Sequence, residues 1–90
     1  MSPSTAARLE LLGRPGCCLC DEAETALRAL EREYRIEIVK INVDDDADLQ
    51  ARYGDGVPVL RAEGRTWARH RIELETIRRK LDTLGVRRDR

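Results

Sequence analysis

The chain has 90 residues, of which 41% are hydrophobic and 38% charged, and its 17 basic and 17 acidic side chains cancel at neutral pH. This size predicts a single domain over residues 1–90 with a small core, and the apolar runs are too short to span a membrane. The first residues show no signal-peptide pattern, so we expect a cytoplasmic protein without a membrane partner. Residues 1–7 and 86–90 are expected to be flexible tails.

The charge is unevenly distributed along the chain. Residues 61–90 hold 10 of the 17 basic side chains but only 5 of the 17 acidic ones. A nucleic-acid site would need aromatic side chains among the basic ones, and Trp67 is the only aromatic residue in this part of the sequence. We therefore expect no nucleic-acid partner, and interpret the basic part as a solvated helix face with at most weak steering of an acidic partner.

The first half of the chain alternates between strand and helix patterns. Residues Arg8 to Leu12 alternate enough for a short strand, which the sequence "GRPG" ends. Apolar positions from Leu19 onward recur at helical spacing, which predicts a helix that starts at the cysteines. The β-branched sequence "YRIEIVKINV" at 34–43 predicts a buried strand. Aspartates and a glycine then bound a short predicted helix around Ala47 to Tyr53.

The second half predicts a hairpin and a closing helix. The sequence "VPVLRAEGRTWARH" contains two short strand patterns around a turn at Glu63 and Gly64. An apolar stripe from Leu74 to Leu84 follows, and Gly85 ends it. The predicted order is β-α-β-α-β-β-α, which is typical of a mixed α/β domain.

The sequence "GRPGCCLC" carries the strongest chemical signal. Because Cys17 precedes the first helical turn, unpaired backbone N–H groups and the positive end of the helix dipole favour its thiolate. Arg14 adds to this effect, whereas Asp21 and Glu22 oppose it. These residue types in this order are those expected of a reactive thiol.

The spacing of the three cysteines assigns them different roles. Cys20 lies three residues after Cys17, on the same side of the helical turn and near the buried stripe. The pair therefore combines an exposed nucleophile with a shielded thiol that can resolve a mixed disulfide. Cys18 points about 100° away around the helix, so we interpret it as an auxiliary thiol. Three thiols within four positions cannot connect distant segments, which favours a catalytic or metal-binding role in a reducing compartment.

A second feature is the dipeptide Val57-Pro58. Proline cannot donate to a sheet ladder, which confines it to a strand start, an edge or a special bond geometry. An X-Pro bond is the one place where a cis peptide costs only about 0.5–1 kcal/mol. A cis bond at Pro58 would turn the preceding backbone outward and leave the N–H and C=O of Val57 free to bind an extended ligand.

The element order, the cysteine pair and this proline together resemble the thioredoxin fold. More narrowly, "GRPGCCLCDEA" with "RYGDGVPVL" resembles the small bacterial glutaredoxin-like family, with a Cys-x-Leu-Cys site and a Tyr-Gly-x-x-Val-Pro-Val-Leu segment. The resemblance implies an α/β fold with a four-stranded mixed sheet in order 2-1-3-4 flanked by helices. It also implies Cys17 as nucleophile, Cys20 as resolving thiol and a cis Pro58 beside them.

Some positions depart from the glutaredoxin pattern. Gly56 stands where those proteins usually carry threonine, and the Gly-Gly and Asp pair that hold the carboxylate of glutathione are missing. Glutathione is therefore an optional co-substrate and no cofactor is required. Arg14 is a candidate contact for a ligand carboxylate, with a solvated arginine as the alternative.

Two other patterns receive structural interpretations. Asp44, Asp46 and Asp48 are spaced like the first ligands of a calcium loop, but Leu49 occupies the position that needs glycine, so we predict helix capping and no metal site there. His70 has no second ligand or acid–base partner in the sequence and is interpreted as a surface or loop residue.

Three functional hypotheses follow. The first is a monomeric thiol-disulfide oxidoreductase that acts through Cys17 and Cys20 on protein or low-molecular-weight disulfides. The second is a module that binds a soft metal or an iron–sulfur centre through Cys17, Cys18 and Cys20. The third is a redox-inactive interaction domain of the thioredoxin fold.

Overall fold

The computed structural model describes residues 7–86. It contains four strands and three α-helices, namely β1 (Ala7–Gly13), α1 (Cys18–Glu31), β2 (Ile36–Asn42), α2 (Ala47–Tyr53), β3 (Val59–Ala62), β4 (Arg65–Arg69) and α3 (Leu74–Leu84). Short 3-10 turns, η1 (Val43–Asp45) and η2 (Gly54–Gly56), flank α2. The predicted tails lie outside the described residues, except that Ala7 begins β1 and Val86 packs against the core.

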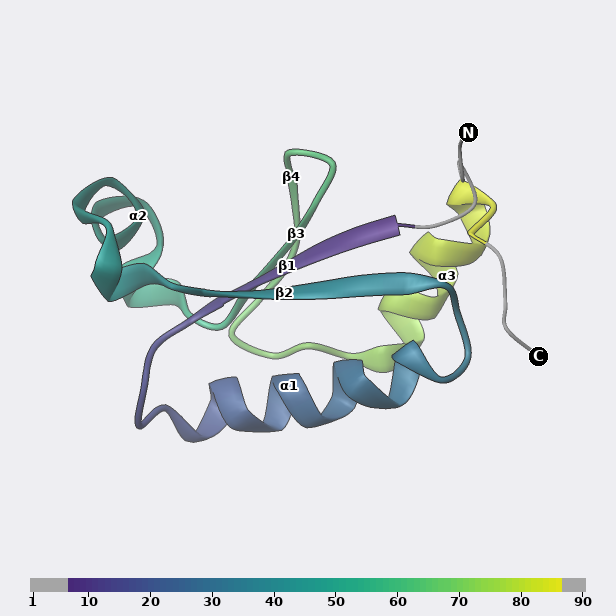
Figure 1. The fold of residues 1–90 in the computed structure, drawn as a ribbon, viewed down its shortest axis with the longest axis horizontal. Coiled ribbons are helices and arrows are strands. Elements are labelled where there is room, and N and C mark those ends of the chain that lie inside the picture. Colours follow the sequence, from purple (N-terminus) through teal and green to yellow (C-terminus); the bar gives the residue numbers. More distant parts are fainter. Residues whose placement is uncertain (1–6, 87–90) are drawn as a thin grey trace.

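The four strands form one mixed sheet in the order β2-β1-β3-β4, with α1 running along it (Figure 1). Strand β1 pairs in parallel with β2 and antiparallel with β3, and β4 completes the sheet as the antiparallel partner of β3. The predicted α/β fold with sheet order 2-1-3-4 is therefore confirmed. Because β1 lies between β2 and β3, the segment after it lies at the centre of the sheet edge.

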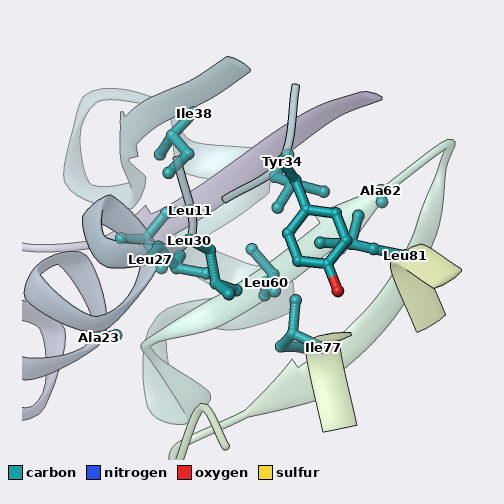
Figure 2. Packing of buried hydrophobic residues seen from close by; sticks show 11 residues of the cluster. Leu11, Ala23, Leu27, Leu30, Tyr34, Ile38, Leu60, Ala62, Ile77 and Leu81 are labelled. Atoms are coloured by element: carbon teal, nitrogen blue, oxygen red, sulfur yellow. The ribbon is translucent and has the colours of Figure 1, made fainter. Parts of the chain in front are cut away.

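The larger core lies between the sheet and helices α1 and α3. Side chains at alternate strand positions point to the same face, and Leu9 and Leu11 of β1 join Leu60 of β3 in this cluster. The helices contribute buried residues at helical spacing, shown with the strand residues in Figure 2: Ala23, Leu27, Leu30, Ile77 and Leu81. Burial of these two helix faces fixes α1, and with it the cysteines, against the sheet.

The opposite face of the sheet carries a smaller core under α2. Leu12, Val43 and Val59 are fully buried there, and Leu49 and Tyr53 of α2 pack against them. This alternation, with Leu11 on one face and Leu12 on the other, is what places helices on both sides of the sheet.

The helix ends follow the predicted capping chemistry. The carboxylate of Asp46 accepts hydrogen bonds from the backbone N–H groups of Asp48 and Leu49, at 2.8 and 3.2 Å, and so caps α2. Gly85 ends α3 in the left-handed conformation, with φ of 77°. Among residues 7–86, no helix combines the length and the apolar character that crossing a membrane would need.

Candidate functional site

The turn between β1 and α1 presents the cysteines. Gly16 has φ of 76°, a conformation that residues with a Cβ rarely adopt, and this turn leads the chain into the helix at Cys17. Cys17 is the N-cap residue of α1, and its Sγ accepts a hydrogen bond of 3.2 Å from the backbone N–H of Cys20. An unpaired N–H group of the first helical turn is therefore directed at the Cys17 sulfur, which is the arrangement that stabilises a thiolate.

The Cys20 thiol lies behind this turn and is only 8% exposed. Burial, followed by a hydrogen bond with the Cys17 side chain, raises the pKa of Cys20 to about 11. Gly13 packs directly against it, since a Cβ at this position would lie 3.0 Å from the Cys20 Sγ. Cys20 is thus held as a protonated, shielded thiol next to a half-buried Cys17.

The two residues between this pair face solvent. Cys18 is exposed, as the helical geometry predicts for an auxiliary thiol. Leu19 is 41% exposed. The surface beside the cysteines is therefore partly apolar.

The sheet brings the proline segment to the same edge as the cysteine turn. The Val57-Pro58 peptide bond is cis, as the sequence suggested. Leu12, near the end of β1, pairs with Val59, the first residue of β3. The turn that leads from β1 to the cysteines and the segment that leads from Pro58 into β3 therefore lie at the same edge of the sheet. Val57 is extended, with φ of −70° and ψ of 150°, and precedes both ladders that β3 forms.

Arg14, predicted to contact a ligand carboxylate, has a carboxylate partner within the protein. Its Nη2 donates to the Oδ1 of Asp44 at 2.9 Å, and Gln50 donates to the same oxygen at 3.2 Å. The guanidinium also lies against Gly54, where a Cβ would come within 3.3 Å of Nη2. Arg14 therefore connects the cysteine turn to the α2 region, and its Nε is buried without a hydrogen-bond partner among the described residues.

Two hollows lie on the surface around the start of α1. One, of about 410 Å³, is lined by Cys20 and Gly13 together with charged residues that include Arg14, Glu24 and Lys40. Glu24 and Lys40 form an ion pair of 3.0 Å there. The cysteine pair therefore borders a polar hollow on its Cys20 side.

The second hollow, of about 330 Å³, lies between α1 and the segment after β4, with Leu19, His70 and Arg71 in its wall. His70 also lies beside Pro58, because its backbone N–H donates to the Pro58 carbonyl at 2.8 Å. Its φ of 60° is left-handed, although His70 is not glycine. The sequence indicated only a surface or loop role for His70. A regular register counted from the turn at Glu63 and Gly64 would place Arg69 opposite Pro58, and the register shift between Leu60 and Arg61 brings His70 there instead.

The described residues contain no group of three or more His, Cys, Asp or Glu side chains arranged to hold a metal ion. Of the aspartates after β2, only Asp46 confirms the capping interpretation, and Asp44 has partners that capping does not predict. Asp46 caps α2, and Asp44 accepts from Arg14 and Gln50. The geometry at the cysteines is that of a thiol pair at a helix start.

A mixed sheet in this order, a Cys-x-x-Cys pair at the start of α1 and a cis proline before β3 define a domain of the thioredoxin fold. The model of the family described as Glutaredoxin-like domain (DUF836) matches residues 8–82. The chain belongs to this family, in agreement with the resemblance seen in its sequence.

Relatives by sequence include uncharacterized proteins of Mycobacterium tuberculosis and Mycobacterium bovis. They are 35% identical over 63 residues, which cover 64% of this chain and 65% of the relatives' length. The match therefore spans slightly less than two thirds of these mycobacterial proteins.

Several solved structures have the same fold. A Nitrosomonas europaea protein determined by solution NMR is 33% identical, with a TM-score of 0.74 over 82% of this chain and 89% of its own. An X-ray structure of a protein from X. campestris is 36% identical, with a TM-score of 0.70 over 83% and 96%. A mutant thioredoxin from Halobacterium salinarum is 23% identical, with a TM-score of 0.64 over 88% and 74%, and shows the fold alone.

Proposed function

We propose that this protein is a thiol-disulfide oxidoreductase that uses Cys17 and Cys20 in a dithiol mechanism. The observation that carries the proposal is the asymmetry of the pair. The Cys17 sulfur is half-buried at the helix start and accepts a backbone N–H, whereas Cys20 is buried with a raised pKa. Thiolate stabilisation at one sulfur and protection of the other are the two requirements of disulfide exchange.

The proposed reaction has two exchange steps. The Cys17 thiolate attacks a substrate disulfide, forms a mixed disulfide with one substrate sulfur and releases the other as a thiolate. Cys20 then loses its proton and attacks the Cys17 sulfur, which releases the second substrate thiolate and leaves a Cys17–Cys20 disulfide. The substrate gains two electrons, and a thiol reductant, for which glutathione is one source to test, must return two electrons to the protein.

The segment at Val57-Pro58 is proposed to hold the substrate during this reaction. Val57 is extended and lies before the first residue of β3 at the edge where the cysteine turn leaves β1. An extended substrate segment could pair with its backbone in the manner of an added strand. Cys18, which is exposed, has no step in this mechanism.

Replacement of single cysteines tests the proposal. With a disulfide substrate, Cys20→Ser should accumulate a mixed disulfide at Cys17 that mass spectrometry detects, while Cys18→Ser should turn over like the wild type. Cys17→Ser should form no adduct at Cys20, because that thiol is buried and protonated. Absence of any adduct in Cys20→Ser, with the protein folded and reduced, would refute the dithiol mechanism.

A further inference from the structure

The segment that follows β4 places a run of basic residues beside the cis proline. Arg69 is the last residue of β4 and pairs with Val59, directly after Pro58. His70 follows and donates its backbone N–H to the Pro58 carbonyl. With Arg71, these residues form what we call the basic loop (Arg69–Arg71), and all three are exposed.

Two of these side chains border the segment proposed to hold the substrate. A Cβ built on Gly56 would lie 3.6 Å from the Nη1 of Arg69 and 3.9 Å from the Nε2 of His70. Gly56 immediately precedes Val57, so these cationic or titratable groups lie next to the proposed substrate strand. A side chain at position 56 would occupy the space beside them.

The third residue of the basic loop lies at the second hollow, beside α1. Arg71 lines the 330 Å³ hollow together with Leu19, which lies between the cysteines in α1. Glu22 and Glu73 also line this hollow and carry the opposite charge. The hollow therefore carries both charges. Its Arg71 belongs to the basic loop, which His70 connects to Pro58.

The arginines of the loop are available to a partner. Within residues 7–86, neither Arg69 nor Arg71 forms an ion pair, whereas Arg14, Arg28, Arg61 and Arg78 all do. His70 has a left-handed backbone, which most residues avoid, and its N–H bond to the Pro58 carbonyl holds this segment against Pro58. Unusual backbone conformations of this kind concentrate at ligand sites.

We propose that the basic loop selects protein disulfides whose cysteines are flanked by acidic residues. This inference rests on the proposed function and adds the substrate class to it. Carboxylates in an extended segment along Val57 would meet Arg69, which lies beside Gly56, and carboxylates over the hollow at Leu19 would meet Arg71. The occupant is taken to be a polypeptide because Val57 offers an extended backbone segment to a strand-like partner, and charge complementarity of this kind acts mainly on encounter and specificity.

A single-turnover experiment tests this selection. Reduced protein is mixed with a short peptide that contains an internal disulfide, made in three versions with Glu, Gln or Lys beside its cysteines. The second-order rate constant for forming the Cys17–Cys20 disulfide is measured after acid quench. The dithiol supplies both electrons, so no other reductant is needed.

We expect the Glu peptide to react about five-fold faster than the Gln peptide at low salt, as two exposed ion pairs allow, and the Lys peptide to react slowest. The difference should largely vanish at about 1 M salt, where the screening length is about 3 Å. In Arg69→Gln/Arg71→Gln, the ratio of Glu to Gln rates should approach one.

The matched control is Arg65→Gln/Arg79→Gln, which removes the same charge at exposed positions outside the hollow and the loop. The control should keep the wild-type ratio of Glu to Gln rates. If this ratio falls as far in the control as in Arg69→Gln/Arg71→Gln, net charge and not the basic loop causes the preference, and the inference is overturned. The salt dependence of the wild type gives a second readout that needs no variant.

The other outcomes separate the inference from the function on which it rests. Equal rates for all three peptides, or a preference for Lys, would overturn the inference while the oxidoreductase proposal stands. Failure of every peptide to oxidise the protein would overturn the proposed function itself. If the loop variant reduces glutathione disulfide more slowly than the wild type but reduces all three peptides equally well, the partner is a small carboxylated disulfide. The polypeptide assignment is then overturned.

Discussion

The Cys17–Cys20 turn concentrates two opposite environments within four residues. A backbone N–H points at the Cys17 sulfur, whereas burial keeps the proton on Cys20. Both residues lie on one side of the first helical turn, and the difference arises because Cys20 is covered by β1 at Gly13, while Cys17 at the N-cap is only half-buried. The different burial of the two thiols therefore follows from where the start of α1 meets the sheet.

The raised pKa of Cys20 predicts the pH dependence of the resolving step. Only the thiolate attacks, and burial, the main cause that raises the pKa of Cys20 to about 11 in the dithiol, remains when Cys17 is in a mixed disulfide, so the thiolate fraction at neutral pH is small. The fraction rises about ten-fold per pH unit until the pKa is reached, so the rate at which Cys20 resolves a mixed disulfide should rise with pH through the range from about 7 to about 10. Decay of a preformed adduct on the wild type, followed by quenched alkylation, measures it.

A variant without the Cys20 thiol provides the control for this pH dependence. Under the proposed mechanism Cys20→Ser should form the mixed disulfide at Cys17 without resolving it, so its adduct should persist at every pH in the range. Resolution in the wild type that does not change with pH would contradict the assignment of a protonated, buried Cys20.

Gly13 is predicted to be needed for the position of Cys20. In Gly13→Ala the new Cβ would lie 3.0 Å from the Cys20 Sγ and 3.2 Å from its Cβ, so the Cys20 side chain must give way by a few tenths of an ångström. Overpacking of this kind lowers the free energy of unfolding by about 1–3 kcal/mol, measured by urea denaturation. Gly56→Ala is the control, since its nearest contact is an ordinary 3.6 Å. Equal stability of the two variants would show that the close contact has no energetic consequence.

At the scale of elements, a charged network connects the sheet to α2. Arg61 of β3 donates from its Nη2 to Glu10 of β1 at 2.7 Å and from its Nη1 to the Tyr53 hydroxyl at 3.1 Å, with its guanidinium over the Tyr53 ring. The Arg61 and Glu10 side chains are 23% and 24% exposed. The network lies on the same sheet face as the smaller core and holds α2 in place.

Removal of Arg61 should therefore destabilise the protein. Arg61→Ala leaves the half-buried Glu10 carboxylate and the Tyr53 hydroxyl without their donor, which costs about 1–3 kcal/mol, measured as the free energy of unfolding in urea. Arg65→Ala, at an exposed position on the neighbouring strand, should change it by less than about 0.5 kcal/mol. Equal effects of the two substitutions would exclude a structural role for the network.

The elements themselves were largely predictable because each has a local signal. The helix at Ala47–Tyr53 matches its prediction, since Asp46 caps one end and glycine follows the other. The 3-10 turns on either side of α2 were not anticipated, because three residues are too few for a periodic pattern. The Arg14–Asp44 pair was also missed, since its members lie 30 positions apart and only the folded sheet edge brings them together.

At the scale of the whole molecule, the fold joins two unlike halves. The β1-α1-β2 half has a parallel strand pair and the β3-β4-α3 half an antiparallel one, and the ladder between β1 and β3 connects them. A polar contact reinforces this connection at the far end of the core. The buried Tyr34, which precedes β2, donates its hydroxyl to Asp82 of α3 at 3.0 Å.

Tyr34→Phe should weaken the association of the two halves without changing the shape of the core. Loss of the hydrogen bond should lower the free energy of unfolding by about 0.5–1.5 kcal/mol, and the midpoint of thermal unfolding should fall accordingly. A double-mutant cycle with Asp82→Ala isolates the pairwise contribution. Strict additivity of the two substitutions would show that this contact does not couple the halves.

The two hollows beside α1 have different walls. Cys20 lines only the first, whereas His70 and Arg71 of the basic loop line only the second. Changes to residues 69–71 therefore need not disturb the surroundings of Cys20. Under the proposed function, reversing the charge of that loop offers a route to orthogonal reductases, in which two copies of one scaffold would act on separate sets of targets in the same cell.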